Sequence, residues 1–208
     1  MQTHFMERLR HKIMKKISKM RRSASFTKEY YRLQHKFSAP YQQNNWLLEH
    51  KERLLPFLGK SVLEVGCGNG KFLHSIAGEV DRAIGIDWAA PHSTEKTPKN
   101  IEFKQADALT FDFSKEQAEL ICSADVLEHF PSDVIPGLIK NMQAGAKYNF
   151  HVIACYDDGH SHVTVQPANW WLKQFRNISS DYRIEQSVQE NLTVQRATCI
   201  ITNLPYRV

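Results

Sequence analysis

The sequence predicts an α/β fold in which helices cover both faces of a mostly parallel sheet. Two observations support this prediction. From Ser61 onwards, short apolar runs alternate with helical or loop stretches, which is the pattern of strands and helices in a parallel sheet. The first apolar run leads directly into a glycine-rich turn, Gly66-Cys67-Gly68-Asn69-Gly70, and glycines let backbone approach a ligand closely.

The size and composition of the chain are those of one globular domain. Its 208 residues are enough for one sizeable core and too few for two ordinary domains. No apolar run reaches the roughly 18 residues that span a bilayer, and the N-terminus has no apolar signal-peptide core. The four cysteines are scattered without a CxxC pair, which argues against a disulfide framework or a zinc site. We therefore expect a cytoplasmic protein.

The net positive charge is concentrated in the first 22 residues, which hold eight basic residues and one acid, whereas the remainder holds 19 basic and 21 acidic residues. Apolar residues in this arm recur at spacings of three and four, which predicts a basic amphipathic helix over residues 3–22. Its candidate partners are an anionic membrane at the inner face, its own domain or a second copy as a lid, and nucleic-acid phosphates. The near-neutral body and the absence of interleaved aromatic residues favour the first two.

Residues 23–42 are polar and aromatic, with Pro40 among them. We predict a linker or a lid there, so the expected division of the chain is an arm and linker over residues 1–42 and a folded domain over residues 43–208.

Within the expected domain, residues 43–58 carry a helical pattern that Gly59 closes as a C-terminal cap. The other predicted helices are Lys71–Ile76, Ser132–Met142 and Ala168–Phe175. The predicted strands are Ser61–Val65, Arg82–Ile86, Ile101–Lys104, Leu120–Ser123, Tyr148–Ala154, Tyr182–Val188 and Ala197–Thr202. No helical pattern separates the last two strands, which indicates a hairpin.

The strongest functional signal is the turn Gly66–Gly70 after the apolar run Val62–Val65. The helix predicted from Lys71 presents unpaired N–H groups to a ligand. The spacing is G-x-G-x-G, whereas dinucleotide sites have G-x-G-x-x-G. Glu64 lies in the strand just before the turn, where a carboxylate would repel a pyrophosphate but attract a ligand that carries an ammonium and a sulfonium.

Three further blocks follow the glycine turn. Asp87 ends an apolar run about 20 residues beyond it, where a carboxylate can accept both hydroxyls of a ribose, and Trp88 beside it can stack on adenine. Asp107 follows the third strand and can accept the adenine amino group. The block Glu119–Phe130 opens as a strand and ends in a short amphipathic turn at the carboxyl edge of the sheet, where ligands of open α/β sheets bind.

In order and spacing, these blocks resemble the class I S-adenosylmethionine (SAM)-dependent methyltransferases over roughly residues 45–208. The ending Leu127-Glu128-His129 resembles the branch of ubiquinone-biosynthesis O-methyltransferases and many small-molecule and glycan methyltransferases. The resemblance implies a Rossmann-like, seven-stranded, mostly parallel sheet with an antiparallel last strand, and SAM as the cofactor. It implies cofactor contacts from Glu64, Gly66, Gly68, Gly70, Asp87, Trp88, Asp107, Ala108 and Ser123.

A hydroxyl acceptor must lose a proton, and histidine is the usual base near neutral pH. His162 is our first candidate for that base. His129 is the second, with a structural role in fixing its turn as the competing interpretation. The loop Asp157–His162 is richer in Asp and His than the family pattern. These residue types can bind a metal, but they are commonly only solvated in loops, so we expect no metal.

The sequence therefore predicts methyl transfer from SAM to a hydroxyl of a small molecule, a lipid-linked intermediate or a glycan. The first alternative is an RNA or protein methyltransferase that uses the basic arm for binding, which the near-neutral body disfavours. The second is a non-catalytic interaction module with this fold, which the intact Gly66, Gly68, Gly70 and Asp87 disfavour. The segment Asn203-Leu204-Pro205-Tyr206 matches an adenine-methyltransferase signature, but it lies far from the fourth strand, where that signature belongs.

Overall fold

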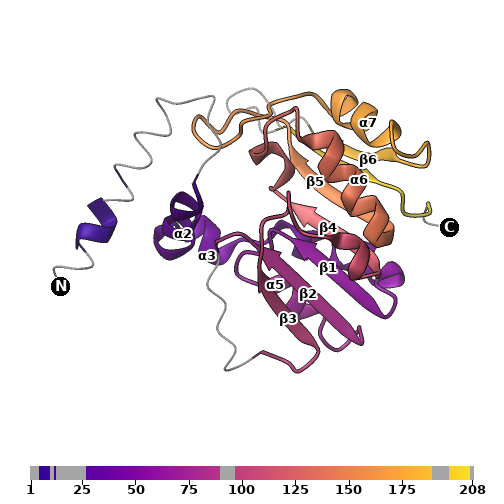
Figure 1. Cartoon of the computed structure of the whole chain (residues 1–208), viewed down its shortest axis with the longest axis horizontal. Helices are drawn as coiled ribbons and strands as arrows, with labels where there is room; N and C mark the ends of the chain where they lie inside the picture. Colours follow the sequence, from indigo (N-terminus) through magenta and orange to yellow (C-terminus); the bar gives the residue numbers. More distant parts are fainter. Residues whose placement is uncertain (1–4, 10–11, 13–26, 90–96, 189–196, 207–208) are drawn as a thin grey trace.

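The computed structural model describes residues 5–9, 12, 27–89, 97–188 and 197–206. In these residues, one seven-stranded sheet has the order β3-β2-β1-β4-β5-β7-β6, and Figure 1 shows it at the centre of the molecule. The strands are β1 (Ser61–Val65), β2 (Arg82–Asp87), β3 (Ile101–Gln105), β4 (Ala118–Ala124), β5 (Ala146–Ala154), β6 (Arg183–Val188) and β7 (Thr198–Thr202). Strands β1 to β5 pair in parallel, and β7 is antiparallel to both β5 and β6. The predicted sheet is confirmed.

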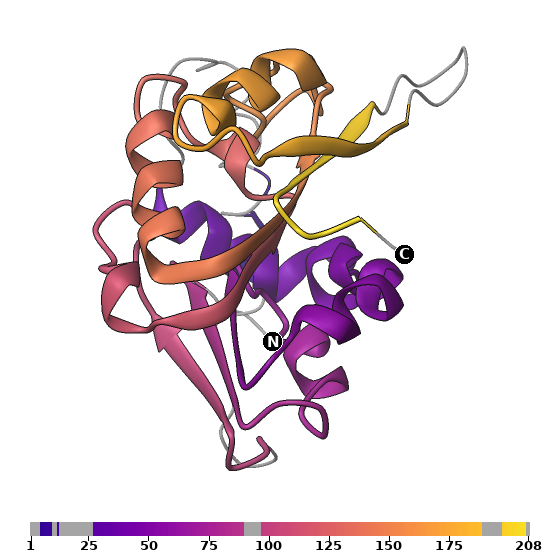
Figure 2. The same cartoon turned by 90° about the vertical axis from the view of Figure 1, so that its right-hand side faces the viewer.

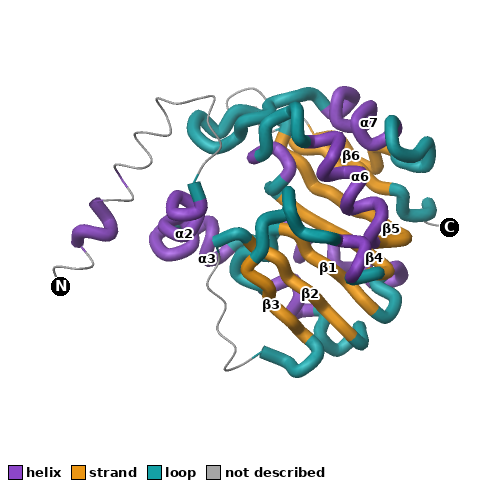
Figure 3. Tube along the Cα trace, viewed as in Figure 1, coloured by secondary structure: helices purple, strands orange, loops and turns teal. Residues whose placement is uncertain are grey.

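Helices lie on both faces of the sheet (Figures 2 and 3). The α-helices are α2 (Lys28–Phe37), α3 (Ala39–Gln43), α4 (Lys51–Leu54), α5 (Lys71–Ser75), α6 (Ile135–Gly145) and α7 (Ala168–Arg176). The 3₁₀ turns are η1 (Trp46–His50), η2 (Leu55–Phe57), η3 (Phe113–Lys115) and η4 (Leu127–His129). None of the helices among the described residues is long and apolar enough to cross a membrane.

The sheet separates two hydrophobic cores, because successive strand side chains point to opposite faces. On one face, Leu63 and Ile121 pack with α6 and α7, whose buried residues include Trp171. On the other face, Val62 packs with Phe72 of α5 and with residues of η1 and α4. Both faces of the parallel strands are therefore covered, and the carboxyl ends of the strands are left as the edge where a ligand can bind.

Two predicted helices differ from the structure. The helix expected over residues 43–58 is divided into η1, α4 and η2. Pro56 lies in η2, where a proline cannot donate to the fourth preceding carbonyl and clashes with it. The helix expected from Ser132 begins at Ile135 and has a proline in its first turn, a position that favours a helix start.

The segment 23–42, expected to be a linker or a lid, contains α2 and most of α3. Thr27 caps α2 by accepting the N–H of Tyr30 with its hydroxyl, and Tyr30 and Leu33 are buried. Helix α2 is therefore packed onto the domain, and the boundary between residues 42 and 43 stays a prediction.

The predicted arm helix over residues 3–22 is described only at residues 5–9 and 12, which are helical. The rest of that prediction lies outside the described residues. At the other end of the chain, β6 and β7 pair antiparallel, as the expected hairpin requires, and the segment 189–196 between them is outside the described residues.

Candidate functional site

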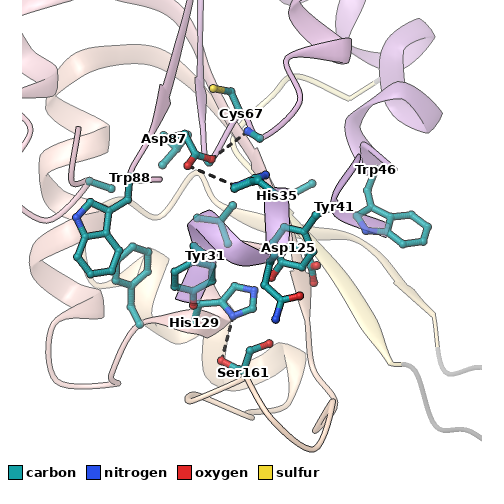
Figure 4. A pocket seen from close by; sticks show the side chains of 18 of the residues that line it. Tyr31, His35, Tyr41, Trp46, Cys67, Asp87, Trp88, Asp125, His129 and Ser161 are labelled. Atoms are coloured by element: carbon teal, nitrogen blue, oxygen red, sulfur yellow. Dashed lines mark hydrogen bonds and ion pairs between the residues drawn. The ribbon is translucent and has the colours of Figure 1, made fainter. Parts of the chain in front are cut away.

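A pocket of about 470 Å³ lies at the carboxyl edge of the sheet (Figure 4). The glycine turn, the end of β2, the turn after β4 and the loop 156–162 form its walls, and α2 and α3 with the following residues cover it; we call residues 27–45 the cap. The predicted site residues that line the pocket are Glu64, Gly66, Gly68, Asp87, Trp88, Asp107, Ala108, His129 and His162. Residues as distant in the sequence as Tyr31 and His162 thus meet at one site.

Two predicted cofactor residues, Gly70 and Ser123, do not line the pocket. Ser123 is fully buried, and its Oγ lies 2.8 Å from Nδ1 of His151 on the neighbouring strand. Burial lowers the pKa of His151 to about 3, so Ser123 and a neutral imidazole form a hydrogen bond in the core. A Cβ at Gly70 would come within 2.5 Å of the Phe103 ring, so Gly70 allows the turn and its helix to pack on β3.

The glycine turn requires glycine for its backbone as well as for its packing. Gly66, Gly68 and Gly70 have φ values of 68°, 50° and 69°, in the left-handed region that glycine adopts without steric cost. A Cβ at Gly66 would come within 2.4 Å of Val126. A Cβ at Gly68 would face the pocket and meet only the His35 ring, at 3.4 Å, among side chains. The turn therefore exposes backbone to the pocket at Gly68.

Asp87 is held in place by the backbone around it. One carboxylate oxygen, Oδ2, accepts the N–H of Gly68 at 3.0 Å, and Oδ1 accepts the N–H of Ala89 at 2.8 Å. The carboxylate thus links the end of β2 to the glycine turn. Trp88 follows it at the pocket rim and is 37% exposed, which leaves a ring face accessible.

Glu64 is a buried acid with one oxygen left unpaired. Its Oε1 accepts Nδ2–H of Asn45 at 2.9 Å, and its Oε2 has no hydrogen-bond partner among the described residues. Burial raises the pKa of Glu64 to about 8, and the nearby Asp87 adds to that rise, while the Asn45 hydrogen bond opposes it. A buried carboxyl with an orphaned oxygen at a pocket wall is suited to pair with a cation.

The turn after β4 and the loop 156–162 bring His129 and His162 together, with ring centroids 5.1 Å apart. Nδ1 of His162 lies 2.6 Å from the Tyr156 carbonyl oxygen, and Nδ1 of His129 lies 3.0 Å from that of Ser161. A carbonyl only accepts hydrogen bonds, so each Nδ1 carries the proton when the ring is neutral. Both Nε2 atoms are then unprotonated and able to accept a proton.

Asp125 faces His162 across the pocket wall. Its Oδ1 lies 3.6 Å from Nε2 of His162, and its φ of 59° is unusual for a residue other than glycine. Burial opposes the charge on Asp125, but His162 and His129 outweigh it and lower the pKa of Asp125 to about 2. Burial likewise opposes protonation of His162, but Asp125 and the Tyr156 carbonyl outweigh it and raise the pKa of His162.

Four side chains at this wall of the pocket could hold a metal ion, and they are the one such group among the described residues. Atoms of Asp125, Glu128, His129 and His162 all lie within 4.8 Å of one another. Two imidazole nitrogens and two carboxylates are a donor set that zinc and other divalent metals accept. Of the loop considered in the sequence, only His162 belongs to this group. Asp158 instead organises the loop by accepting the N–H groups of residues 160–162.

Sequence reasoning missed the contribution of the cap. Tyr31 lies between Trp88 and His129, with ring centroids 6.3 Å and 5.8 Å away, and Tyr30 Oη lies 3.3 Å from Nδ1 of His160. Asn69 in the glycine turn donates to the carbonyl of Tyr41 at 3.3 Å and to the carbonyl of Asn44 at 2.9 Å. The sequence signals were the aromatic residues and Pro40 in the segment 23–42, which we predicted as a linker or a lid without assigning it any site residue.

The comparisons with known proteins identify the family. A family model described as a methyltransferase domain matches residues 39–191. A ubiquinone biosynthesis O-methyltransferase of Acinetobacter baylyi is 32% identical over 118 residues, which cover 52% of this chain and 47% of that protein. The chain therefore spans about half the length of the curated relatives it matches.

Solved structures share the fold. A complex of DhpI with S-adenosylhomocysteine (SAH) has a TM-score of 0.61 at 18% identity and covers 84% of this chain and 93% of that one. The N-methyltransferase NodS of Bradyrhizobium japonicum in complex with SAH has a TM-score of 0.57 at 19% identity. The match covers 79% of this chain and 89% of that one. Because the family model matches residues 39–191, which are more than half of the chain, the chain belongs to the methyltransferase domain family.

Proposed function

We propose that the protein transfers a methyl group from SAM to a hydroxyl of a small molecule, a lipid-linked intermediate or a glycan. The observation that carries this proposal is that one pocket is lined both by the acids Glu64 and Asp87 and by His129 and His162, whose Nδ1 atoms lie against backbone carbonyls. The name of the curated relatives, which are ubiquinone biosynthesis O-methyltransferases, supports a hydroxyl as the acceptor group. The SAH complexes among the solved neighbours support the cofactor.

The residues present fit this cofactor. The orphaned Oε2 of Glu64 can pair with the ammonium of SAM, and Asp87 can accept the ribose hydroxyls. The exposed backbone at Gly68 lets the ligand approach the turn. Trp88 can stack on adenine, and Asp107 with Ala108 lies further along the same wall. SAM supplies a sulfonium-activated methyl group, so the protein has only to orient the acceptor and take up its proton.

In this proposal His162 is the general base. Its Nε2 takes the proton of the acceptor hydroxyl as the new O–C bond forms and the S–C bond breaks, which gives a methyl ether, SAH and an imidazolium. The Tyr156 carbonyl keeps the Nδ1 proton in place, and the Asp125 carboxylate, 3.6 Å away, stabilises the positive ring. His129 is the second candidate base in the same pocket.

The charges around the pocket favour a neutral or cationic acceptor over a phosphate-bearing one. Among the described residues, those that line the pocket include no lysine or arginine and five acids: Glu64, Asp87, Asp107, Asp125 and Asp158. A phosphate or carboxylate near these acids would be repelled. This observation disfavours RNA as the methyl acceptor, and intact cofactor carboxylates disfavour a non-catalytic module.

The proposed function is tested by methyl transfer from labelled SAM to fractionated small molecules, lipids, glycans, RNA and protein, followed by mass spectrometry of the labelled product. We expect a methyl ether in a small-molecule, lipid or glycan fraction. Label that enters only RNA or only protein would overturn the proposed acceptor class. SAM and SAH binding without transfer to any fraction would favour the interaction module.

We also propose an anionic membrane as a partner of the basic arm. In the described part of the arm, Phe5, Met6 and Leu9 are exposed, with exposed fractions of 66%, 58% and 40%, beside Arg8. Replacing all three apolar residues with serine should reduce co-sedimentation with phosphatidylglycerol vesicles several-fold, because apolar burial and charge attraction act together. V165S, which changes an exposed apolar residue elsewhere, is the control. Equal pelleting of the triple variant and the control would exclude the partner.

Cofactor binding should release a proton through Glu64. Burial raises the pKa of Glu64 to about 8, so the carboxyl is mostly protonated near neutral pH, and an ammonium partner favours its ionised form. Affinity for SAH should therefore rise from about pH 6 to about pH 8 and level off above that pKa. Calorimetry in buffers of different ionisation enthalpy measures the number of protons released when SAH binds. E64Q should bind SAH weakly and without this pH dependence, and wild-type binding without proton release would contradict the assignment.

A further inference from the structure

We propose that His35, which the cap helix α2 carries, binds the ribose of the cofactor by sharing one hydroxyl with Asp87. This inference rests on the cofactor in the proposed function and adds a residue that lies about 30 positions before the glycine turn. His35 and Asp87 both line the pocket, and Figure 4 shows the two side chains facing each other.

The distance between the two side chains fits a shared hydroxyl. Nε2 of His35 lies 3.7 Å from Oδ1 of Asp87, and both side chains are only 10% exposed. This distance is within the range of an ion pair but is too long for a direct hydrogen bond. One oxygen placed about 2.8 Å from each atom completes a triangle with that base. A ribose hydroxyl there would donate to the carboxylate and accept from Nε2–H.

Backbone N–H groups fix the orientation of the Asp87 carboxylate beside His35. The Gly68 N–H binds Oδ2, and the Ala89 N–H binds Oδ1, so backbone fixes the carboxylate from the side of the protein. A Cβ at Gly68 would meet Cε1 of His35 at 3.4 Å. The imidazole therefore lies against the glycine turn at Gly68, next to the Asp87 carboxylate.

The cap is fastened so that His35 keeps this position. Asn69 of the glycine turn donates to the carbonyls of Tyr41 and Asn44. Lys71, the first residue of α5, donates to the carbonyl of Gln43. Gln42 donates to the His35 carbonyl at 3.2 Å. The cofactor turn thus holds the cap directly, and the His35 ring is set against the Tyr41 ring with centroids 5.3 Å apart.

Helix α2 also connects this contact to the acceptor side. Tyr31 precedes His35 by four residues and so lies on the same face of the helix, between Trp88 and His129. A cofactor that binds His35 would therefore steady the Tyr31 ring in the wall beside the candidate base. His35 acts here as a binding and positioning residue.

The test is a double-mutant cycle between His35 and the ribose hydroxyls. Calorimetry gives the Kd of SAH and of its 2′-deoxy and 3′-deoxy analogues for wild-type protein and H35A. We expect H35A to weaken SAH binding about tenfold, which corresponds to the loss of one hydrogen bond. For one of the two deoxy analogues, H35A should have little effect, because the shared hydroxyl is already missing. H35Q, which keeps a donor, should recover part of the affinity.

The control variant is H160A. It removes the contact between His160 and Tyr30 of the cap and leaves His35 and Asp87 unchanged. H160A should leave the penalty for each missing hydroxyl unchanged. If H35A also leaves both penalties unchanged, His35 only packs the cap and the inference is overturned. Failure of the proposed cofactor would look different, because wild-type protein would then not bind SAH at all.

Discussion

Replacing His162 with alanine should lower kcat by about two to four orders of magnitude and leave the affinity for SAH nearly unchanged. His162 has its Nδ1 proton fixed by Tyr156 and its Nε2 directed toward Asp125, and no cofactor residue depends on it in the proposed arrangement. The measurement is steady-state methyl transfer to the acceptor found in the fractionation, with SAH binding determined in parallel. H50A, at a half-buried histidine beside Phe150 outside the pocket, is the matched control.

Two results would revise this role. If H162A keeps its kcat while H129A loses it, the base is His129. If both variants lose activity together with a bound divalent ion, measured by elemental analysis, then Asp125, Glu128, His129 and His162 hold a metal and our expectation of none is wrong. A chelator separates these cases, because a pure histidine base keeps its activity after metal removal.

Replacing Asp87 with alanine should raise the Kd of SAM and SAH by about 100-fold, since two hydrogen bonds from ribose to a carboxylate are lost. D87N should lose less, because an amide oxygen can still accept from one hydroxyl. The Asp87 carboxylate also accepts the N–H groups of Gly68 and Ala89, so the thermal midpoint of each variant has to be measured alongside the Kd.

D107A is the comparison for that experiment. Asp107 lies on the pocket wall beside Ala108, and as a single contact to the adenine amino group it should cost only about tenfold. Unchanged affinity in D87A, at a thermal midpoint close to that of wild type, would refute the ribose assignment and the shared hydroxyl of His35 with it.

The sheet could be predicted from the sequence because each strand is a short apolar run between polar or glycine-rich breaks. All seven runs became strands, and β1 has the predicted bounds, Ser61–Val65. The pocket edge followed from the glycine turn and Asp87, since parallel strands end together. Ser123 does not line the pocket. It lies two residues from Ile121 on the same strand, and the period of two gives both side chains the same face of the sheet, where Ser123 is hydrogen-bonded to His151.

The cap could not be predicted in the same way. Tyr31 and His35 reach the pocket through the tertiary packing of α2 on the domain. The anchoring contacts run from the side chains of Asn69 and Lys71 to main-chain carbonyls. Every residue has such a carbonyl, so the amino-acid types in the cap do not indicate these contacts. Glu128 and His129 were visible in the sequence as part of the ending Leu127-Glu128-His129, but their approach to Asp125 and His162 depends on the fold of the turn and the loop.

That manner of attachment has a consequence for how related enzymes can diverge. The contacts that hold the cap reach the peptide groups at positions 41, 43 and 44, so substitutions at Gln43 and Asn44 keep the carbonyls that anchor it. Tyr41 is constrained in addition by its ring contact with His35. Related enzymes can therefore vary positions 43 and 44 while the cap stays attached to the glycine turn.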